Sequence, residues 1–297
     1  MSDKTSAALA RVDGLETRIA LGQPLARGQP LDACCYDSIR AAARQLDFAD
    51  GLVPGIDALN QLTQHHAQPI VTASGHAIRF AAQNLDPAAL SYEAQIFASG
   101  VVPTRPNNIH DLFNALIWLT FPQTKATING RHIAARGGHS GTGNRGPVQD
   151  ALTLFDECGV VVVSDQTELL ELIAAFQWKE LFWKRRDAVK QHMRFFLFGH
   201  GLMEQLLNPY VGLTGKALLI KVDMPWLGAN TSALLQHIDA RSRALIASPA
   251  ALSQGRDLVP LPLLGIPGWA AENEFESYYD DAQYFRVGRR GPPKRKD

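Results

Sequence analysis

The run 109–121 constrains the fold more than any other stretch, because almost every side chain in it is apolar. Such a run predicts a helix that is buried on nearly all sides, and Asn108 before it is a good N-cap. Only His110, Asp111 and Asn114 interrupt the run with strongly polar groups. Asn114 follows the other two by four and three positions, so all three share one helix face. Burying this polar stripe costs free energy unless each group finds a partner, so other polar residues are expected to face it.

A second polar stripe follows at once. Pro122 ends the helix or starts a new one, and Lys125, Asn129 and His132 then recur at helical spacing. Two consecutive helices with opposed stripes predict an αα-hairpin, and Arg105 in the lead-in segment would join the same pocket. Two interpretations stay open: a buried polar network that fixes the register of the hairpin, or a catalytic or ligand-binding site.

The remaining pattern predicts an α+β fold, namely a mainly helical single domain with a small β-sheet and an extended C-terminal docking segment. Further helices are expected at 36–48, 55–65, 86–98, 147–158 (with Gly159 as its C′ residue), 165–176, 178–186 and 228–246. Strands are expected at 160–163, 193–198 and 217–222, with a β-hairpin at 70–80 around Ser74-Gly75. The aromatic segment 277–286 is expected to dock onto the body.

The chain ends carry little periodicity. We expect residues 1–30 to form a mobile arm, 31–287 a single globular domain and 288–297 a disordered basic tail. A glycine-rich segment at 141–146 matches a dinucleotide-binding spacing, but no convincing strand precedes it. We therefore interpret this segment as a loop rather than a phosphate cradle.

Composition narrows the class of partner. The 29 basic and 29 acidic residues give zero net charge, so nothing favours a nucleic acid or an anionic membrane. No signal peptide or transmembrane run is evident. Cys34, Cys35 and Cys158 fit neither a disulfide framework nor a zinc ribbon. We interpret them as reduced thiols and therefore expect a cytoplasmic protein. The expected partner is a small-molecule ligand.

Two further groups carry chemistry. His200 follows the strand 193–198, and Glu204 lies one helical turn later, so both side chains can reach one point. Ligands collect at the carboxyl ends of strands in open α/β sheets. The helix 147–158 adds Asp150 and Asp156 as candidate ligands of a metal ion.

Several motifs together resemble the bacterial Domain of Unknown Function 3025 family over roughly residues 36 to 290. They are Tyr92-Glu93, Val102-Pro103-Thr104-Arg105, the run His110 to Trp118, Phe121-Pro122, the run Asp150 to Glu157, Phe198-Gly199-His200 and Tyr279-Asp280-Asp281. The resemblance implies no mechanism, because that family has no established function.

Three hypotheses of function follow from these residues. The first is a metal-assisted hydrolase of an anionic or phosphate-bearing substrate, with a divalent ion as cofactor. The second is a non-catalytic module that binds a small ligand or peptide, and the third is a metal-free enzyme with His110 or His200 as general base. In the first, catalysis is assigned to His110, Asp111, His200 and Glu204, substrate binding to Arg105, Asn114, Lys125, Asn129 and His132, and metal binding to Asp150 and Asp156.

Replacing Asp111 by alanine tests whether the first polar stripe is partnered. We expect Asp111→Ala to lower the free energy of unfolding by about 1–3 kcal/mol, because its partners lose their acceptor. The measurement is the chemical denaturation midpoint. An unchanged midpoint would mean that the stripe faces bulk water.

Overall fold

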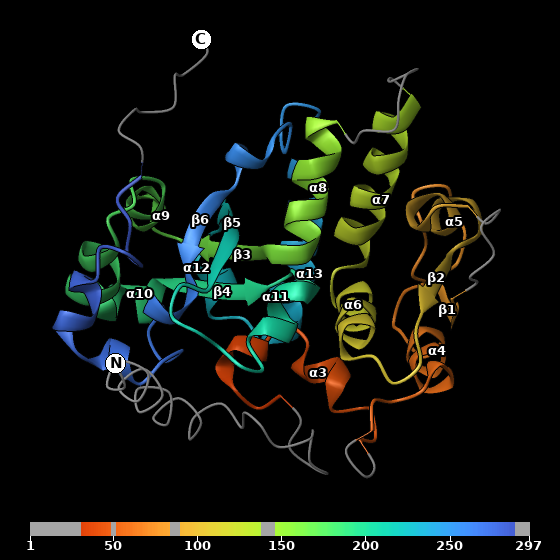
Figure 1. The fold of residues 1–297 in the computed structure, drawn as a ribbon, viewed down its shortest axis with the longest axis horizontal. Coiled ribbons are helices and arrows are strands. Elements are labelled where there is room, and N and C mark those ends of the chain that lie inside the picture. Colours follow the sequence, from red (N-terminus) through yellow and green to blue (C-terminus); the bar gives the residue numbers. More distant parts are fainter. Residues whose placement is uncertain (1–30, 49–51, 84–89, 138–145, 289–297) are drawn as a thin grey trace, which may run out of the picture.

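The computed structural model describes residues 31–48, 52–83, 90–137 and 146–288. It has an α+β architecture in which helices surround a four-stranded sheet and a separate two-stranded sheet (Figure 1). The predictions for residues 1–30, for the tail beyond residue 288 and for most of the glycine-rich segment fall outside these ranges. One continuous apolar core includes side chains from Leu31 to Phe285.

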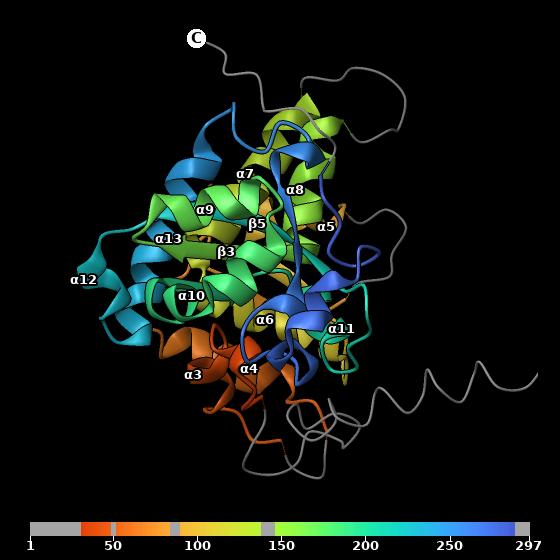
Figure 2. The same cartoon turned by 90° about the vertical axis from the view of Figure 1, so that its left-hand side faces the viewer.

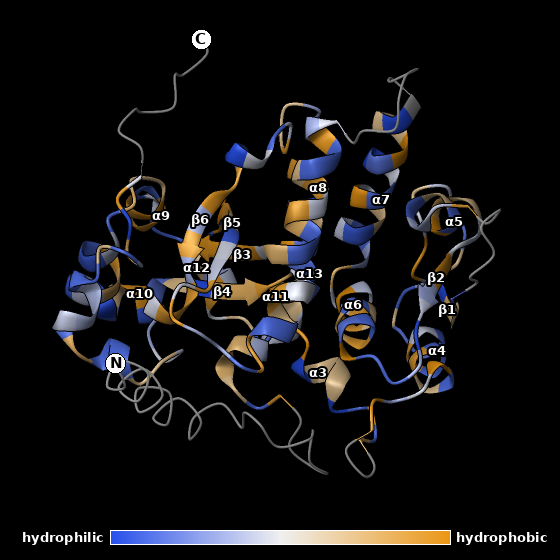
Figure 3. Ribbon diagram, in the orientation of Figure 1, coloured by the Kyte–Doolittle hydropathy of each residue, from blue (hydrophilic) through white to orange (hydrophobic). Residues whose placement is uncertain are grey.

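The larger sheet contains the three strands that the sequence predicts and one that it does not. Its order is β4 (Met193–Leu197), β3 (Gly159–Ser164), β5 (Thr214–Lys221) and β6 (Val259–Pro262). β3 and β5 run parallel, whereas the two outer pairs are antiparallel. All six residues of β3 are buried, as expected for a continuous β-branched run covered on both faces, and β3 and β4 are strongly hydrophobic (Figure 3). β6 was not predicted because it contains two prolines, which a sheet accepts at an edge.

Three helices form a layer beside this sheet. They are α6 (Ile109–Thr120), α7 (Pro122–Gly137) and α8 (Pro147–Cys158). The predicted helix start is confirmed, because the Asn108 side chain accepts a hydrogen bond from the backbone of Asp111. The eight residues from Leu112 to Leu119 are all buried. α7 contacts α6 and α8, and the short α11 (His200–Gln205) packs against both α6 and α8.

The remaining elements are helices around the large sheet, the two strands of the small sheet and short connecting helices. Figure 2 shows α9 (Thr167–Ala174) and α10 (Arg186–His192) in front of the large sheet and α13 (Thr231–Ala247) beside it. The other elements are η1 (Cys34–Tyr36), α3 (Arg40–Ala43), α4 (Ile56–Gln64), β1 (Arg79–Ala82), α5 (Tyr92–Ser99), β2 (Val101–Thr104), η3 (Glu180–Lys184), α12 (Met224–Leu227), η4 (Gly255–Asp257), η5 (Leu263–Gly265), η6 (Glu272–Glu274) and η7 (Glu276–Asp280). The docking of the C-terminal aromatic segment is confirmed, since Tyr279, Tyr284 and Phe285 are buried.

The predicted β-hairpin at 70–80 is present in a short form. The chain reverses around Ser74-Gly75, Val71 and Ala77 form an antiparallel bridge, and the backbone N–H of Ile78 donates to the carbonyl of Ile70 at 2.8 Å. β1 then pairs in parallel with β2, and its Phe80 backbone bonds with the Asn60 side chain of α4. A partner 22 residues away in sequence, as in the pair Arg79 and Val101, is invisible to a local turn pattern.

Several helix boundaries also differ from the prediction. The segment 36–48 contains only η1, α3 and turns, whose short i→i+3 bonds include that from Asp37 N to Cys34 O. The segment 178–186 contains a π-helical turn, and α10 begins only at Arg186. Gly159 is not a left-handed C′ residue but the first residue of β3, with φ −69° and ψ 143°. No gap therefore separates α8 from β3.

The start of α7 is held by a carboxylate from another helix. Asp239 of α13 accepts hydrogen bonds from the backbone N–H of Gln123 (3.0 Å) and of Thr124 (2.8 Å). It also accepts one from the Thr124 hydroxyl at 2.7 Å. Burial raises the pKa of Asp239, although these hydrogen bonds oppose the shift. A negative charge at a helix N-terminus satisfies donors that the helix itself leaves free.

No helix among the residues that the structure describes has the length and hydrophobicity of a membrane-spanning segment.

Removing the carboxylate of Asp239 should destabilise the fold. We expect Asp239→Ala to lower the free energy of unfolding by about 2–3 kcal/mol, because the backbone N–H of Gln123 and the buried N–H and hydroxyl of Thr124 lose their acceptor. Asp187 is exposed, so Asp187→Ala is the matched control. It should change the free energy of unfolding by no more than about 0.5 kcal/mol. Urea denaturation followed by circular dichroism measures both, and equal midpoints would show that the interhelix cap contributes nothing.

Candidate metal centre

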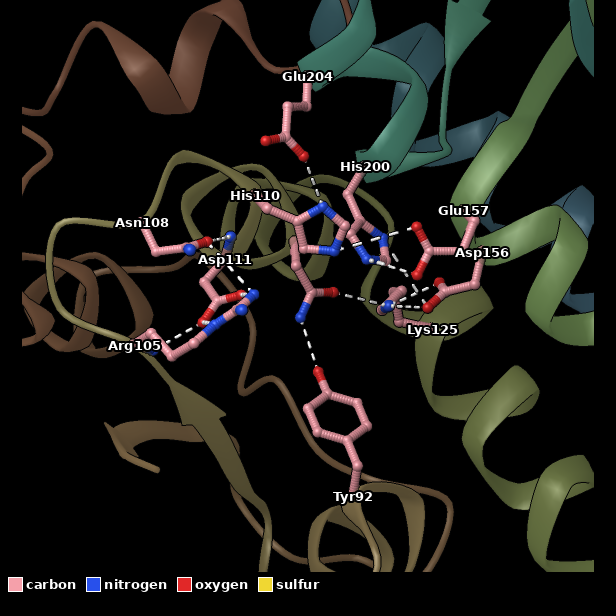
Figure 4. Close-up of polar contacts among 11 residues, drawn as sticks. Tyr92, Arg105, Asn108, His110, Asp111, Lys125, Asp156, Glu157, His200 and Glu204 are labelled. Carbon is pink, nitrogen blue, oxygen red and sulfur yellow. Dashed lines mark hydrogen bonds and ion pairs between the residues drawn. The ribbon is translucent and has the colours of Figure 1, made fainter. Parts of the chain in front are cut away.

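Two histidines that are 90 residues apart in sequence meet where α6 and α11 begin. His110 lies in the first turn of α6, and His200 is the first residue of α11, directly after β4 and Gly199. Their rings are 4.5 Å apart between centroids and cross at 74°. Figure 4 shows both rings between Glu204 on one side and Glu157 on the other.

Glu157, at the end of α8, faces both histidines. Its carboxylate lies 3.4 Å from Nε2 of His200 and 4.0 Å from Nε2 of His110. Hydrogen bonding with His200 lowers the pKa of Glu157 despite its partial burial. A Cβ atom at Gly201 would lie 2.5 Å from the Glu157 carboxylate, so glycine at this position lets the carboxylate rest against α11.

The antiparallel pairing of β3 and β4 explains why these residues meet. Val160 at the start of β3 pairs with Leu197 at the end of β4. The residues just before β3 therefore lie beside those just after β4, which places Glu157 next to His200. The sequence indicated both strands but not their pairing, and so it assigned Glu157 no role.

Each histidine has a second carboxylate near its other ring nitrogen. His110 donates from Nδ1 to Glu204 at 2.9 Å. Nδ1 of His200 lies 3.9 Å from Oδ2 of Asp156, which is beyond hydrogen-bond distance. The sequence pattern placed Glu204 with His200, whereas in the structure Glu204 contacts His110 and the carboxylates near His200 are those of Asp156 and Glu157.

The two polar stripes meet through Lys125. Its side chain is only 4% exposed, and Nζ donates to both carboxylate oxygens of Asp156 (2.6 and 2.9 Å) and to Asn114 (2.9 Å). Asn114 in turn donates to the Tyr92 hydroxyl at 2.7 Å. Burial alone would raise the pKa of Asp156, but the positive charge of Lys125 leads the opposing effects and the pKa falls. In this arrangement Lys125 and Asn114 bond to protein groups rather than to a substrate.

Arg105 and Asp111 form a separate pair beside His110. The guanidinium donates to both carboxylate oxygens, at 3.0 and 2.7 Å, and the backbone N–H of Arg105 adds a bond of 2.6 Å. Burial would raise the pKa of Asp111, but the hydrogen bonds from Arg105 lower it. Asp111 therefore anchors the lead-in to α6, while half of the Arg105 side chain (52%) stays exposed.

Two of the predicted site residues, Asn129 and Asp150, lie away from the histidine pair. Asn129 donates to the backbone and carboxylate of Glu93. His132 is buried on α7 and is among the groups that lower the pKa of Asp156. Asp150 is exposed and lies nearly two helical turns before Glu157, so the structure gives it no contact with either histidine. Asp156 is not among the three residues whose ligand atoms converge, and both of its oxygens accept from Lys125.

His110, Glu157 and His200 fit the donor set of a divalent metal ion. One ligand atom from each lies within 4.8 Å of the others. Ligand atoms about 2.1 Å from a tetrahedral zinc ion are about 3.4 Å apart, and two histidines with one carboxylate form an open, catalytic type of zinc site. The observed distances, 3.4 Å from His200 Nε2 to Oε1 of Glu157 and 4.0 Å from His110 Nε2 to Oε2, lie at or above this spacing. A separate cavity of about 900 Å³ is lined by residues that include Arg44 and Asp239. Its lining does not include His110, Glu157 or His200.

Comparison with known proteins places most of the chain in one family. A family model described as "Protein of unknown function (DUF3025)" matches residues 78–289. The chain belongs to the DUF3025 family. All residues of the histidine cluster and of the Lys125 network fall inside the matched DUF3025 region. No curated protein and no solved structure matches the chain.

The Arg105–Asp111 pair predicts a pH-dependent contribution to stability. Because the folded pKa of Asp111 is lowered, the stabilisation is fully present above the ordinary value of 3.8 and is lost as the pH falls through the lower folded value. At neutral pH we expect Arg105→Ala to lower the free energy of unfolding by about 0.5–1 kcal/mol, since half of the Arg105 side chain is exposed.

Urea denaturation across acidic to neutral pH measures this difference. The difference in the free energy of unfolding between wild type and Arg105→Ala should disappear at acidic pH. Arg79 is exposed and forms no ion pair in the described part of the chain, so Arg79→Ala is the control and should give no such trend. A gap that is independent of pH would contradict the assignment.

Proposed function

We propose that this protein is a metal-dependent hydrolase in which His110, Glu157 and His200 hold a divalent ion. The observation that carries the proposal is the convergence of two histidine Nε2 atoms on one carboxylate. A divalent ion held in this way lowers the pKa of a bound water and polarises the bond to be cleaved. The donor set of two nitrogens and one oxygen favours zinc.

The exposure of the ligands supports a catalytic rather than a structural ion. The Glu157 side chain is 41% exposed, and the described residues supply three ligands rather than the four of a closed site. Glu204 would orient His110 through its 2.9 Å contact. Because 45% of the Glu204 side chain is exposed, its second oxygen is also our candidate for accepting a proton from an attacking water.

We propose a small anionic substrate, such as a phosphate ester. The charge of the metal ion would neutralise one anionic oxygen, and the exposed face of the Arg105 guanidinium offers a second contact. A cavity of about 350 Å³ at the start of α6 is lined by Arg105, Asn108 and Leu112 but by none of the three metal ligands, so Arg105 is the residue that would connect it to the metal site. Lys125, Asn114 and Asn129 are left out of substrate binding because of their protein partners.

Two alternatives have support of their own. The saturation of Lys125 and Asn114 by protein groups favours a binding module whose polar stripe is structural. The Glu204–His110 contact favours a metal-free enzyme with His110 as general base. The first predicts a metal or ligand complex without turnover, and the second predicts turnover that chelators leave unchanged.

We place the hydrolase in the cytoplasm. The proposal is supported by Cys34, Cys35 and Cys158, all three of which are free thiols.

Metal removal and restoration test the proposed function. Purified protein should contain one divalent ion per chain, and dialysis against a chelator should abolish hydrolysis of p-nitrophenyl phosphate, bis-p-nitrophenyl phosphate or p-nitrophenyl acetate. Zinc or manganese should restore the activity. We expect His200→Ala to lose at least about 100-fold in turnover, because the metal that activates the water loses a ligand.

The exposed His65 at the end of α4 provides the matched control. His65→Ala should keep both the metal content and the activity. A chelator-resistant activity, or metal binding without hydrolysis of any of the three substrates, would overturn the hydrolase proposal in favour of one of the two alternatives.

A further inference from the structure

The two candidate metal-binding histidines differ in what holds the nitrogen that faces away from Glu157. For His110 that nitrogen, Nδ1, donates to Glu204 at 2.9 Å. For His200, Nδ1 is buried without a hydrogen-bond partner, and the carboxylate that faces it is that of Asp156 at 3.9 Å. A buried polar nitrogen without a partner is costly, so its orientation toward a carboxylate requires an explanation.

Asp156 is kept in place by a buried cation. Both of its oxygens accept from Nζ of Lys125, and Lys125 is itself held by Asn114 at 2.9 Å. The ring of Trp118 lies 5.5 Å from the same Nζ. A carboxylate oxygen has more than one lone pair, so Oδ2 can accept a further hydrogen bond while its contact with Lys125 persists.

We infer that Asp156 is a positioning residue for the metal centre, and this inference rests on the proposed function. When Nε2 of His200 binds a divalent ion, the ring proton is on Nδ1, and a movement of about 1 Å brings it to Oδ2 of Asp156. Lys125 holds this acceptor charged and oriented. Histidines that bind metals depend on such acceptors to fix the ring and raise its basicity.

This arrangement links the surface metal centre to the buried polar network. The chain of contacts runs from the metal ligand His200 to Asp156 and Lys125, and then through Asn114 to Tyr92 of α5. Loss of an outer carboxylate of this kind lowers metal affinity by about 10–100-fold. Asp156, which the sequence suggested as a metal ligand, is thereby assigned to orienting a ligand.

Two double variants separate positioning from stability. Lys125→Met with Asp156→Asn, and Lys125→Met with Asp156→Leu, both remove the buried ion pair, and replacing such a pair as a unit often preserves folding. Only the first retains an oxygen that can accept from His200. The probe is Co²⁺, with its dissociation constant from chelator competition and its visible absorption as a report of ligand geometry.

We expect the asparagine variant to bind Co²⁺ about 10-fold more tightly than the leucine variant. The thermal midpoints of the metal-free variants are measured alongside, because a purely structural role would change those midpoints and not the affinity ratio. If the leucine variant does not fold, Lys125→Met with Asp156→Ala takes its place.

The outcomes distinguish this inference from the proposed function. Wild-type protein that binds no Co²⁺ would overturn the metal centre and the positioning role together. Wild-type binding together with equal affinity and spectrum in the two double variants would overturn the positioning role alone and leave the metal centre intact.

Discussion

The buried ion pair of Lys125 and Asp156 is the contact on which the arrangement of the helices depends. Two charges withdrawn from water are tolerated only when their geometry is close and their remaining hydrogen-bonding capacity is used. Here Nζ contacts both carboxylate oxygens and the side chain of Asn114. The pair joins α7 to α8 and, through Asn114, to α6. Because a lone partner would be left as an unpaired buried charge, the three helices are constrained to one relative register.

The sheet supplies the second constraint, which brings the histidines to Glu157. α8 ends at Cys158 and β3 begins at Gly159, so no loop intervenes between Glu157 and a fully buried strand. On the neighbouring strand, His200 follows β4 after only two residues. Side chains placed at the ends of rigid elements hold their geometry better than those on long loops, and a metal centre requires such fixed ligands.

The two interpretations of the polar stripe on α6 each describe part of it. Asn114 belongs to the buried network, and Asp111 anchors the lead-in segment through Arg105. His110, one position earlier, lies at the surface end of the same helix and contacts Glu204 and Glu157. A helix that is buried along most of its length and open in its first turn therefore carries structural residues and a candidate ligand side by side.

Local chemistry determined much of this protein from sequence alone: the start of α6 at its Asn108 cap, the buried strand β3 and the contact between the two stripes at Asn114 and Lys125. These features depend on spacing and capping within a few residues. Glu157 could not be selected over Asp150, because the choice depends on β3 pairing with β4, whose partners lie 29 to 37 residues apart in sequence. The parallel pairing of β1 with β2 was missed for the same reason. Only the tertiary structure decided which polar groups meet, since strand pairing and helix packing are set by the burial of the whole core rather than by any one segment.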